Sequence, residues 1–194
     1  MKQWLKSGRV FVVFGLLFFA SCDPAKEFEA ELKTIDSCMT RIDELEKMYM
    51  EINFDSLQLM VDHIMYNEDM MRKYYKSDTV NRDLGIYMNN CKGFRKTLKD
   101  LHGKQVGFQD EIFAFRVQFK NMKTDIMNGA MTKEQVAEYL PAEKEAVHNF
   151  DLRFVEFYEL QKSQIPIYHQ AVPVVDMYVS ALVIPDSNNV NLEP

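Results

Sequence analysis

A heptad repeat of apolar residues between positions 80 and 126 constrains the fold more than any other feature of this chain. Steps of four and three residues place one buried stripe along a helix that packs against neighbouring helices. The stripe comprises Val80, Leu84, Tyr87, Cys91, Phe94, Leu98 and Leu101, and it resumes at Phe108, Ile112, Phe115, Phe119, Met122 and Ile126. Gly103 and Gly107 predict a turn near residues 102–107, and one long, locally weakened helix is the alternative.

The preceding segment shows the same periodicity. Its apolar face is formed by Phe28, Leu32, Ile35, Met39, Ile42, Leu45, Tyr49 and Ile52, and acidic residues are frequent at the other positions. The sequence NFDS, residues 53–56, predicts a second helix from Asp55, although a continuous helix across this point is also possible. The sequence KSDT, residues 76–79, predicts the next break because its side chains favour helix caps.

Helix signals continue toward the C-terminus. Asn128 and Gly129 predict a helix end, and the residues from Thr132 to Gln135 form a capping box for a short helix. Pro141 suits the first turn of a last long helix. For residues 165–184 we favour a kinked helix over a strand, and residues 185–194 are expected to be a disordered tail. The prediction is an all-α fold, an elongated antiparallel bundle of three to five long helices within residues 22–184.

The N-terminus carries an export signal. Lys2, Lys6 and Arg9 precede an apolar run of eleven residues at positions 10–20, which is too short to span a bilayer. The run ends in Phe-Ala-Ser-Cys, which resembles the lipobox of bacterial lipoproteins. The resemblance implies removal of residues 1–21, acylation of Cys22 with palmitate-type chains, and a membrane anchor. An ordinary secretory signal and an uncleaved anchor are the alternatives.

Charge and cysteine content limit the possible partners. The chain has a net charge of −6, and the predicted signal holds three of its basic residues and no acidic one. We therefore expect no nucleic-acid partner, because phosphates require a basic footprint. Cys38 and Cys91 remain after Cys22 is assigned to the lipid. They either pair in an oxidising compartment or lie buried as free thiols.

Few residue patterns point to chemistry. Glu145 and His148 have the spacing of helical di-iron ligands, but such sites need two of these pairs. A copper site is conceivable from His63 with Met48, Met50, Met60, Met65, Met70 and Met71. Methionines at helical spacing more often fill a core. Lys92, Arg95, Lys96 and Lys99 form a basic face that meets water, the acidic first helix, lipid headgroups or a polyanion. We predict no enzyme and no cofactor.

Residues 121–150 resemble a stretch of small lipoproteins of unknown function from Bacteroidota-type bacteria. Asp125, Ile126, Gly129, Tyr139 and Glu143 carry the similarity. The resemblance implies a place in the cell envelope, with the outer membrane favoured, on its periplasmic or surface face. We expect a bundle that acts by contact with an envelope protein, by self-association or as a structural element. A small-ligand or copper-type metal-binding bundle is the alternative function.

Overall fold

The computed structural model describes residues 24–76 and 81–183, and every secondary-structure element in these ranges is an α-helix. A short α1 (Pro24–Glu27) leads into α2 (Glu29–Met50) and α3 (Phe54–Tyr74). The return leg consists of α4 (Arg82–Thr97) and α5 (Leu101–Met127), and α6 (Lys133–Val183) completes the described chain. The predicted all-α fold is therefore confirmed, with five long helices in the described ranges.

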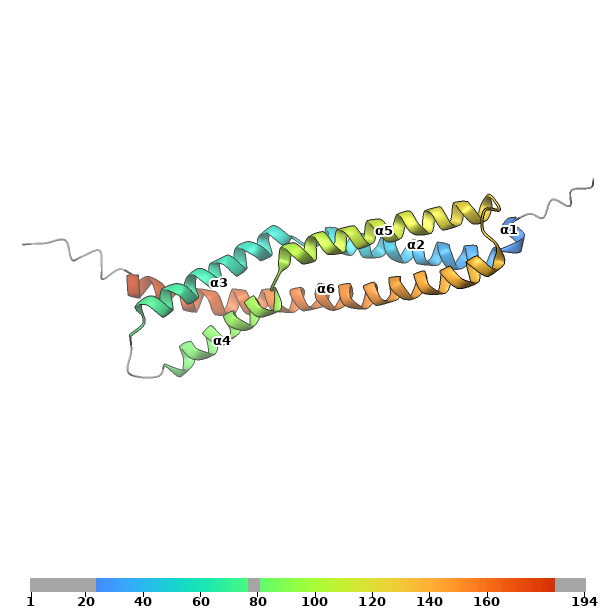
Figure 1. Cartoon of the computed structure of the whole chain (residues 1–194). Helices are drawn as coiled ribbons and strands as arrows, with labels where there is room; N and C mark the ends of the chain where they lie inside the picture. The colour runs from blue at the N-terminus through green and yellow to red at the C-terminus, as the bar shows by residue number, and fades with distance from the viewer. Residues whose placement is uncertain (1–23, 77–80, 184–194) are drawn as a thin grey trace, which may run out of the picture.

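The helices form an elongated antiparallel bundle in which α6 runs along its whole length (Figure 1). At 1.5 Å per residue its 51 residues span about 76 Å. One half of the bundle packs α2 and α5 against α6, and the other half packs α3 and α4 against α6. The end of the bundle that holds α1 is thus far from the end that holds the start of α4.

The predicted apolar stripes form the core. Ile35, Ile42 and Leu45 of α2 are buried, as are Phe94 of α4 and Phe119 of α5. Aromatic rings fill the α2/α5/α6 half and the centre of the bundle, where Phe108 contacts three phenylalanines of α6. The heptads therefore mark the buried faces correctly, because burial of this apolar surface is the main driving force for packing.

The break between α2 and α3 lies where NFDS suggested it. Asn53 is the N-cap of α3, and its side chain accepts a hydrogen bond from the backbone N–H of Ser56 at 2.9 Å. Opposite it, the break between α4 and α5 falls at residues 98–100, so the predicted turn at 102–107 is wrong, as is the single long helix. Asp100 takes a left-handed conformation with φ 59°, which interrupts the helical backbone between α4 and α5.

Gly103 has a different role from the predicted one. It lies inside α5, where a Cβ atom would come within 2.5 Å of the carboxylate of Asp100. The missing side chain therefore leaves room for Asp100 to fold over the first turn of the helix. Gly129, by contrast, has φ 66° and follows the last residue of α5, as predicted.

The last two predicted helices form one continuous helix, α6. Thr132 and Gln135 do form the capping box: each backbone N–H donates to the other residue's side chain. The helix then continues through Pro141, Pro166 and Pro173, all three exposed. A proline on the outer face leaves the unpaired carbonyl of the preceding turn in water, so the helix can continue. The predicted helix start at Pro141 and the strand alternative for 165–184 are both wrong.

Candidate functional site

A polar network crosses the apolar interface between α3 and α6. His63 and Asn67 lie one turn apart on α3, and Tyr168 and Asp176 face them from α6. The two ring nitrogens of His63 lie 2.9 Å from the Tyr168 hydroxyl and 3.0 Å from an Asp176 carboxylate oxygen. Asn67, only 3% exposed, donates to the same carboxylate oxygen at 2.6 Å.

The geometry of the network leaves little capacity for proton transfer to a substrate. In the tautomer with its proton on Nε2, the His63 ring donates to Asp176 and accepts the hydrogen bond of the Tyr168 hydroxyl at Nδ1. Burial, followed by the negative charge of Asp176, raises the pKa of Tyr168, so its phenol stays protonated at neutral pH. Both ring nitrogens are thereby occupied, and the network ties α3 to α6.

The two inner cysteines are free and buried, in different halves of the bundle. Burial first, and then the charges of Glu68 and Asp176, raises the pKa of Cys91 to about 11. Burial likewise raises the pKa of Cys38. A thiol rather than a thiolate is present at neutral pH, so neither cysteine is an activated nucleophile. Of the two predicted alternatives, the structure has the buried thiols.

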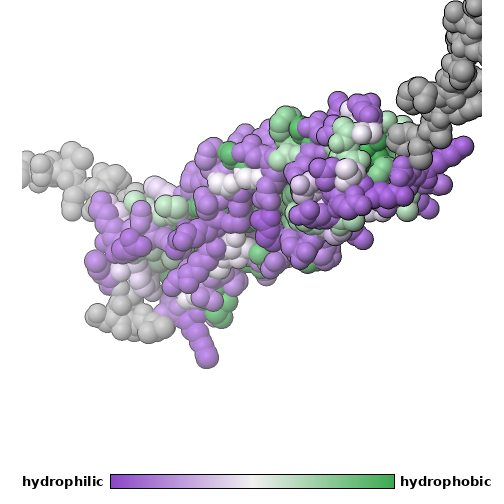
Figure 2. Space-filling model, turned by 45° about the vertical axis from the view of Figure 1, so that its right-hand side comes forward, coloured by the Kyte–Doolittle hydropathy of each residue, from purple (hydrophilic) through white to green (hydrophobic). Residues whose placement is uncertain are grey.

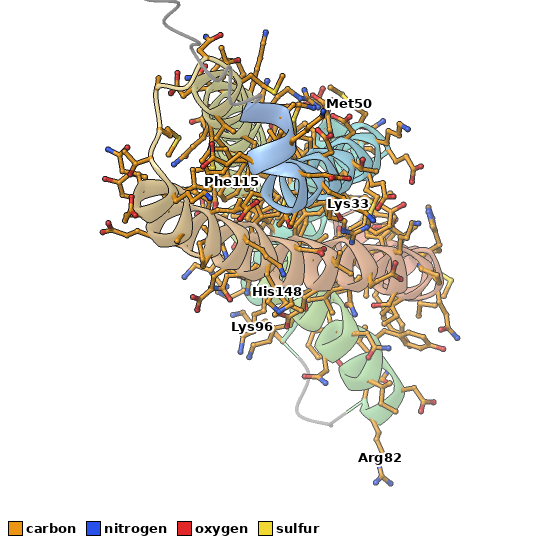
Figure 3. All side chains as sticks on the ribbon, turned by 90° about the vertical axis from the view of Figure 1, so that its right-hand side faces the viewer. Lys33, Met50, Arg82, Lys96, Phe115 and His148 are labelled. Carbon is orange, nitrogen blue, oxygen red and sulfur yellow. The ribbon has the colours of Figure 1, made fainter. Side chains whose placement is uncertain are left out.

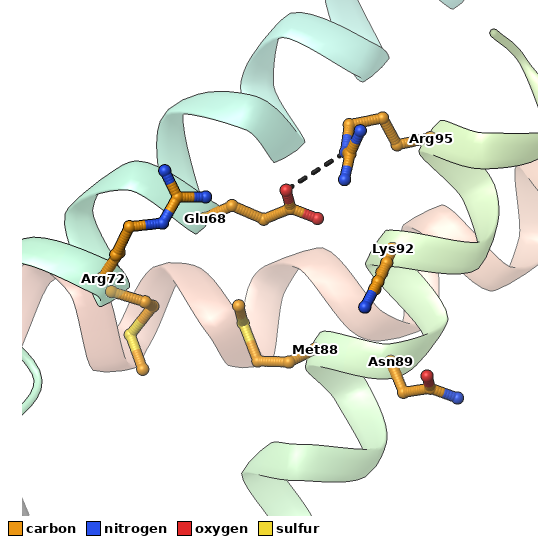
Figure 4. Close-up of a pocket in the computed structure, with 7 residues that line it drawn as sticks. Glu68, Arg72, Met88, Asn89, Lys92 and Arg95 are labelled. Carbon is orange, nitrogen blue, oxygen red and sulfur yellow. Dashed lines mark ion pairs between the residues drawn. The ribbon is translucent and has the colours of Figure 1, made fainter.

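A hollow of about 540 Å³ lies between α3 and α4 (Figure 4). Three cations and one carboxylate line it: Arg72, Lys92, Arg95 and Glu68. Arg95 Nε lies 3.1 Å from Glu68, whose side chain is only 15% exposed, while Arg72 pairs with Asp69 at the edge. Met71, Met88 and Asn89 complete the wall. The hollow therefore carries an excess of positive charge.

The basic face predicted on α4 is present. Lys92 and Lys96 of α4, and Lys99 two residues past its end, form this face; all three are exposed and have no ion-pair partner among the described residues. Figure 3 shows Lys96 and Arg82 on the outer side of α4, with Arg82 pointing away from the bundle. The predicted contact with the acidic first helix is wrong, because Arg95 pairs with Glu68 of α3 and not with α2.

The other candidate residues are not brought together. Glu145 and His148 lie exposed on α6, and no group of three potential metal-binding side chains occurs in the part of the chain that the structure describes. Met71 is buried, whereas Met50 and Met65 are exposed, so the methionines do not converge on His63. Cys22 and the signal, residues 1–21, lie outside the described residues, as does the tail at 185–194.

Sequence reasoning missed the partners of His63. Asn67 and Asp176 are polar residues on otherwise apolar faces of their helices, and that mismatch is the one signal that could have indicated them. Nothing in the spacing relates Asn67 to Asp176, because the contact joins residues 109 positions apart.

Comparisons of the chain with protein-family models, with curated proteins and with solved structures found no significant match. None of the helices in the described ranges is both long enough and apolar enough to cross a membrane.

Proposed function

We propose that this protein is a lipid-anchored bundle of the cell envelope that acts by contact with another protein. The sequence supports the anchor through the signal pattern that ends at Cys22. The fold supports the contact role through its length, because α1, which follows the anchor in the chain, and the start of α4 lie at opposite ends (Figure 1). The basic residues at the end of α4 lie near the middle of the bundle, between these two ends, and are thereby held away from the attachment point.

The observation that carries the contact role is the basic face of α4 on an acidic protein. Lys92, Lys96 and Lys99 are exposed and unpaired within the described ranges, next to a hollow with further positive charge. Arg41, Arg116 and Arg153 pair with carboxylates, whereas Lys92, Lys96 and Lys99, spaced by four and three residues, have no such partner in the described ranges. Complementary potentials steer association and select partners. The partner we propose is therefore a protein with an acidic surface.

The anchor and the contact can be tested separately in cells of the source organism that produce the full chain. Mass spectrometry should find an acylated N-terminal peptide that starts at Cys22, and Cys22→Ser should abolish it. An N-terminus without acyl groups contradicts the anchor.

For the contact, the full chain is crosslinked in intact cells and purified. The variant Lys92→Glu/Lys96→Glu should lose the crosslinked protein. The matched control Lys33→Glu/Lys47→Glu makes the same change of charge at exposed positions of α2 and should retain the protein. Equal capture by both variants, or capture of anionic lipid and no protein, contradicts the proposed contact.

A further inference from the structure

An apolar stripe lies on the outer face of α5. Val106, Phe113 and Val117 are exposed, and 67% of the Phe113 surface is open to solvent. Their spacing of seven and four residues puts them on one side of the helix. The buried residues Phe108 and Phe119 belong to the opposite side. The helix is thus apolar on two faces, and none of the described elements packs on the outer one.

This stripe differs from the other exposed apolar residues. Leu59 of α3 and Met177 of α6 are similarly exposed, but neither has another exposed large apolar residue one helical turn away, as Phe113 has in Val117. Single exposed apolar side chains are normal on soluble proteins, whereas a contiguous row marks an interaction site. Figure 2 shows such apolar patches within a mostly hydrophilic surface.

Two charges flank the Phe113–Val117 pair symmetrically, and the first of them separates Phe113 from Val106. Asp110 and Lys120 are exposed on the same side of α5, and neither has an ion-pair partner among the described residues. Residue 115 is the midpoint between them, and it is also the midpoint between Phe113 and Val117. Two copies of α5 packed antiparallel about this point therefore align Phe113 with Val117 and Asp110 with Lys120, whereas Val106 faces Thr124.

We propose that a second copy of this chain docks antiparallel on the outer face of α5. Phe113 of each copy packs against Val117 of the other, and Asp110 of each pairs with Lys120 of the other. Every contact is made twice, as a two-fold interface requires. This self-complementarity favours a second copy over an unrelated protein, which would have to supply the same pattern independently.

The proposed dimer deepens the proposed contact role. It rests on that role in one respect, which is that the protein acts through its surface. The antiparallel arrangement overlaps the α2/α5/α6 halves of the two bundles. The α3/α4 halves then point away from each other, so the basic face of α4 stays accessible in both copies. The two interactions can therefore fail independently.

The test measures the mass of the full chain, purified in a mild detergent, by light scattering over a wide range of concentration. The wild type should reach the mass of a dimer, and Phe113→Glu should stay a monomer. Leu59→Glu is the matched control, since Leu59 is 70% exposed on another helix, and it should still dimerise. Circular dichroism checks that each variant keeps its helices. A wild type that is monomeric throughout, or equal masses for both glutamate variants, overturns the proposal.

The charges test the antiparallel register. Asp110→Lys places like charges opposite each other twice and should weaken the dimer about tenfold. The swapped variant Asp110→Lys/Lys120→Asp restores both pairs and should regain the wild-type affinity. Failure of the swap to rescue association overturns the register. The α4 variant Lys92→Glu/Lys96→Glu should keep the dimer, so loss of the envelope partner and loss of the dimer are distinguishable.

Discussion

Replacement of Phe154 by alanine tests whether the aromatic cluster stabilises the bundle. Phe154 is 0% exposed. Its ring centroid lies 5.1 Å from that of Phe108 and 5.8 Å from that of Phe150. Removal of a fully buried ring loses its transfer free energy and leaves a cavity, which together cost about 3–5 kcal/mol. Because domains of this size unfold with about 5–15 kcal/mol, Phe154→Ala should remain folded but much less stable.

Urea unfolding followed by far-ultraviolet circular dichroism measures the effect. With a slope of about 2 kcal/mol per molar urea, the midpoint for Phe154→Ala should fall by about 2 M. Phe154→Leu keeps part of the side-chain volume, so its urea midpoint should fall by less than that of Phe154→Ala. The control Leu152→Ala removes a side chain that is 58% exposed on the same helix, and it should change the free energy of unfolding by less than about 0.5 kcal/mol. Equal midpoints for Phe154→Ala and Leu152→Ala would refute burial of the cluster.

Three further predictions concern single interactions. Asn53→Ala removes the cap of α3 and should lower the free energy of unfolding by about 1 kcal/mol, measured by the same urea titration. A hydrogen bond from Arg116 lowers the pKa of Glu46 in the folded protein. The pair therefore stabilises the fold fully above the pKa that Glu46 has in the unfolded chain. This contribution is lost as the pH falls through the lower pKa of Glu46 in the folded protein. Unfolding midpoints measured from neutral to acidic pH should thus depend less on pH in Arg116→Met, and an unchanged pH profile contradicts the pairing. Cys91, with its pKa raised to about 11, should react with a thiol reagent at mildly alkaline pH only after urea is added, and rapid labelling of the native protein contradicts its burial.

The sequence predicted the buried faces well because burial repeats with the helix period. Ile35, Ile42 and Phe94 were all expected in the core and are fully buried or nearly so. Helix boundaries were predictable where a local signal was sufficient, as with the capping box at Thr132 and the positive φ of Gly129. In these places the local preference and the tertiary packing agree.

The predictions failed where packing overrides a local signal. Two glycines suggested a turn near 102–107, but α5 begins before both, and the left-handed residue is Asp100, an uncommon choice for that conformation. Pro141 suggested a helix start, yet it lies on an exposed face of a helix that began earlier. The polar network was missed because its hydrogen bonds join distant parts of the chain, which periodicity does not report.

The continuity of α6 explains why both other legs break at the middle of the bundle. A straight helix drifts about 20° per heptad from a strict seven-residue repeat, so over 51 residues its apolar face turns by about 140°. The drift is visible where two neighbours are both buried, at Phe157 with Tyr158 and at Ala171 with Val172. Unbroken partner helices would lose contact with this moving face unless all three supercoiled.

Breaks at Glu51–Asn53 and at residues 98–100 instead let each leg resume with a shifted face. Hydrogen bonds hold the two breaks at one level of the bundle. Tyr49 donates to the carbonyl of Gln105 at 3.3 Å, and Tyr158 of α6 donates to Glu51. The breaks therefore allow the two shorter legs to follow the full length of α6 without a supercoil.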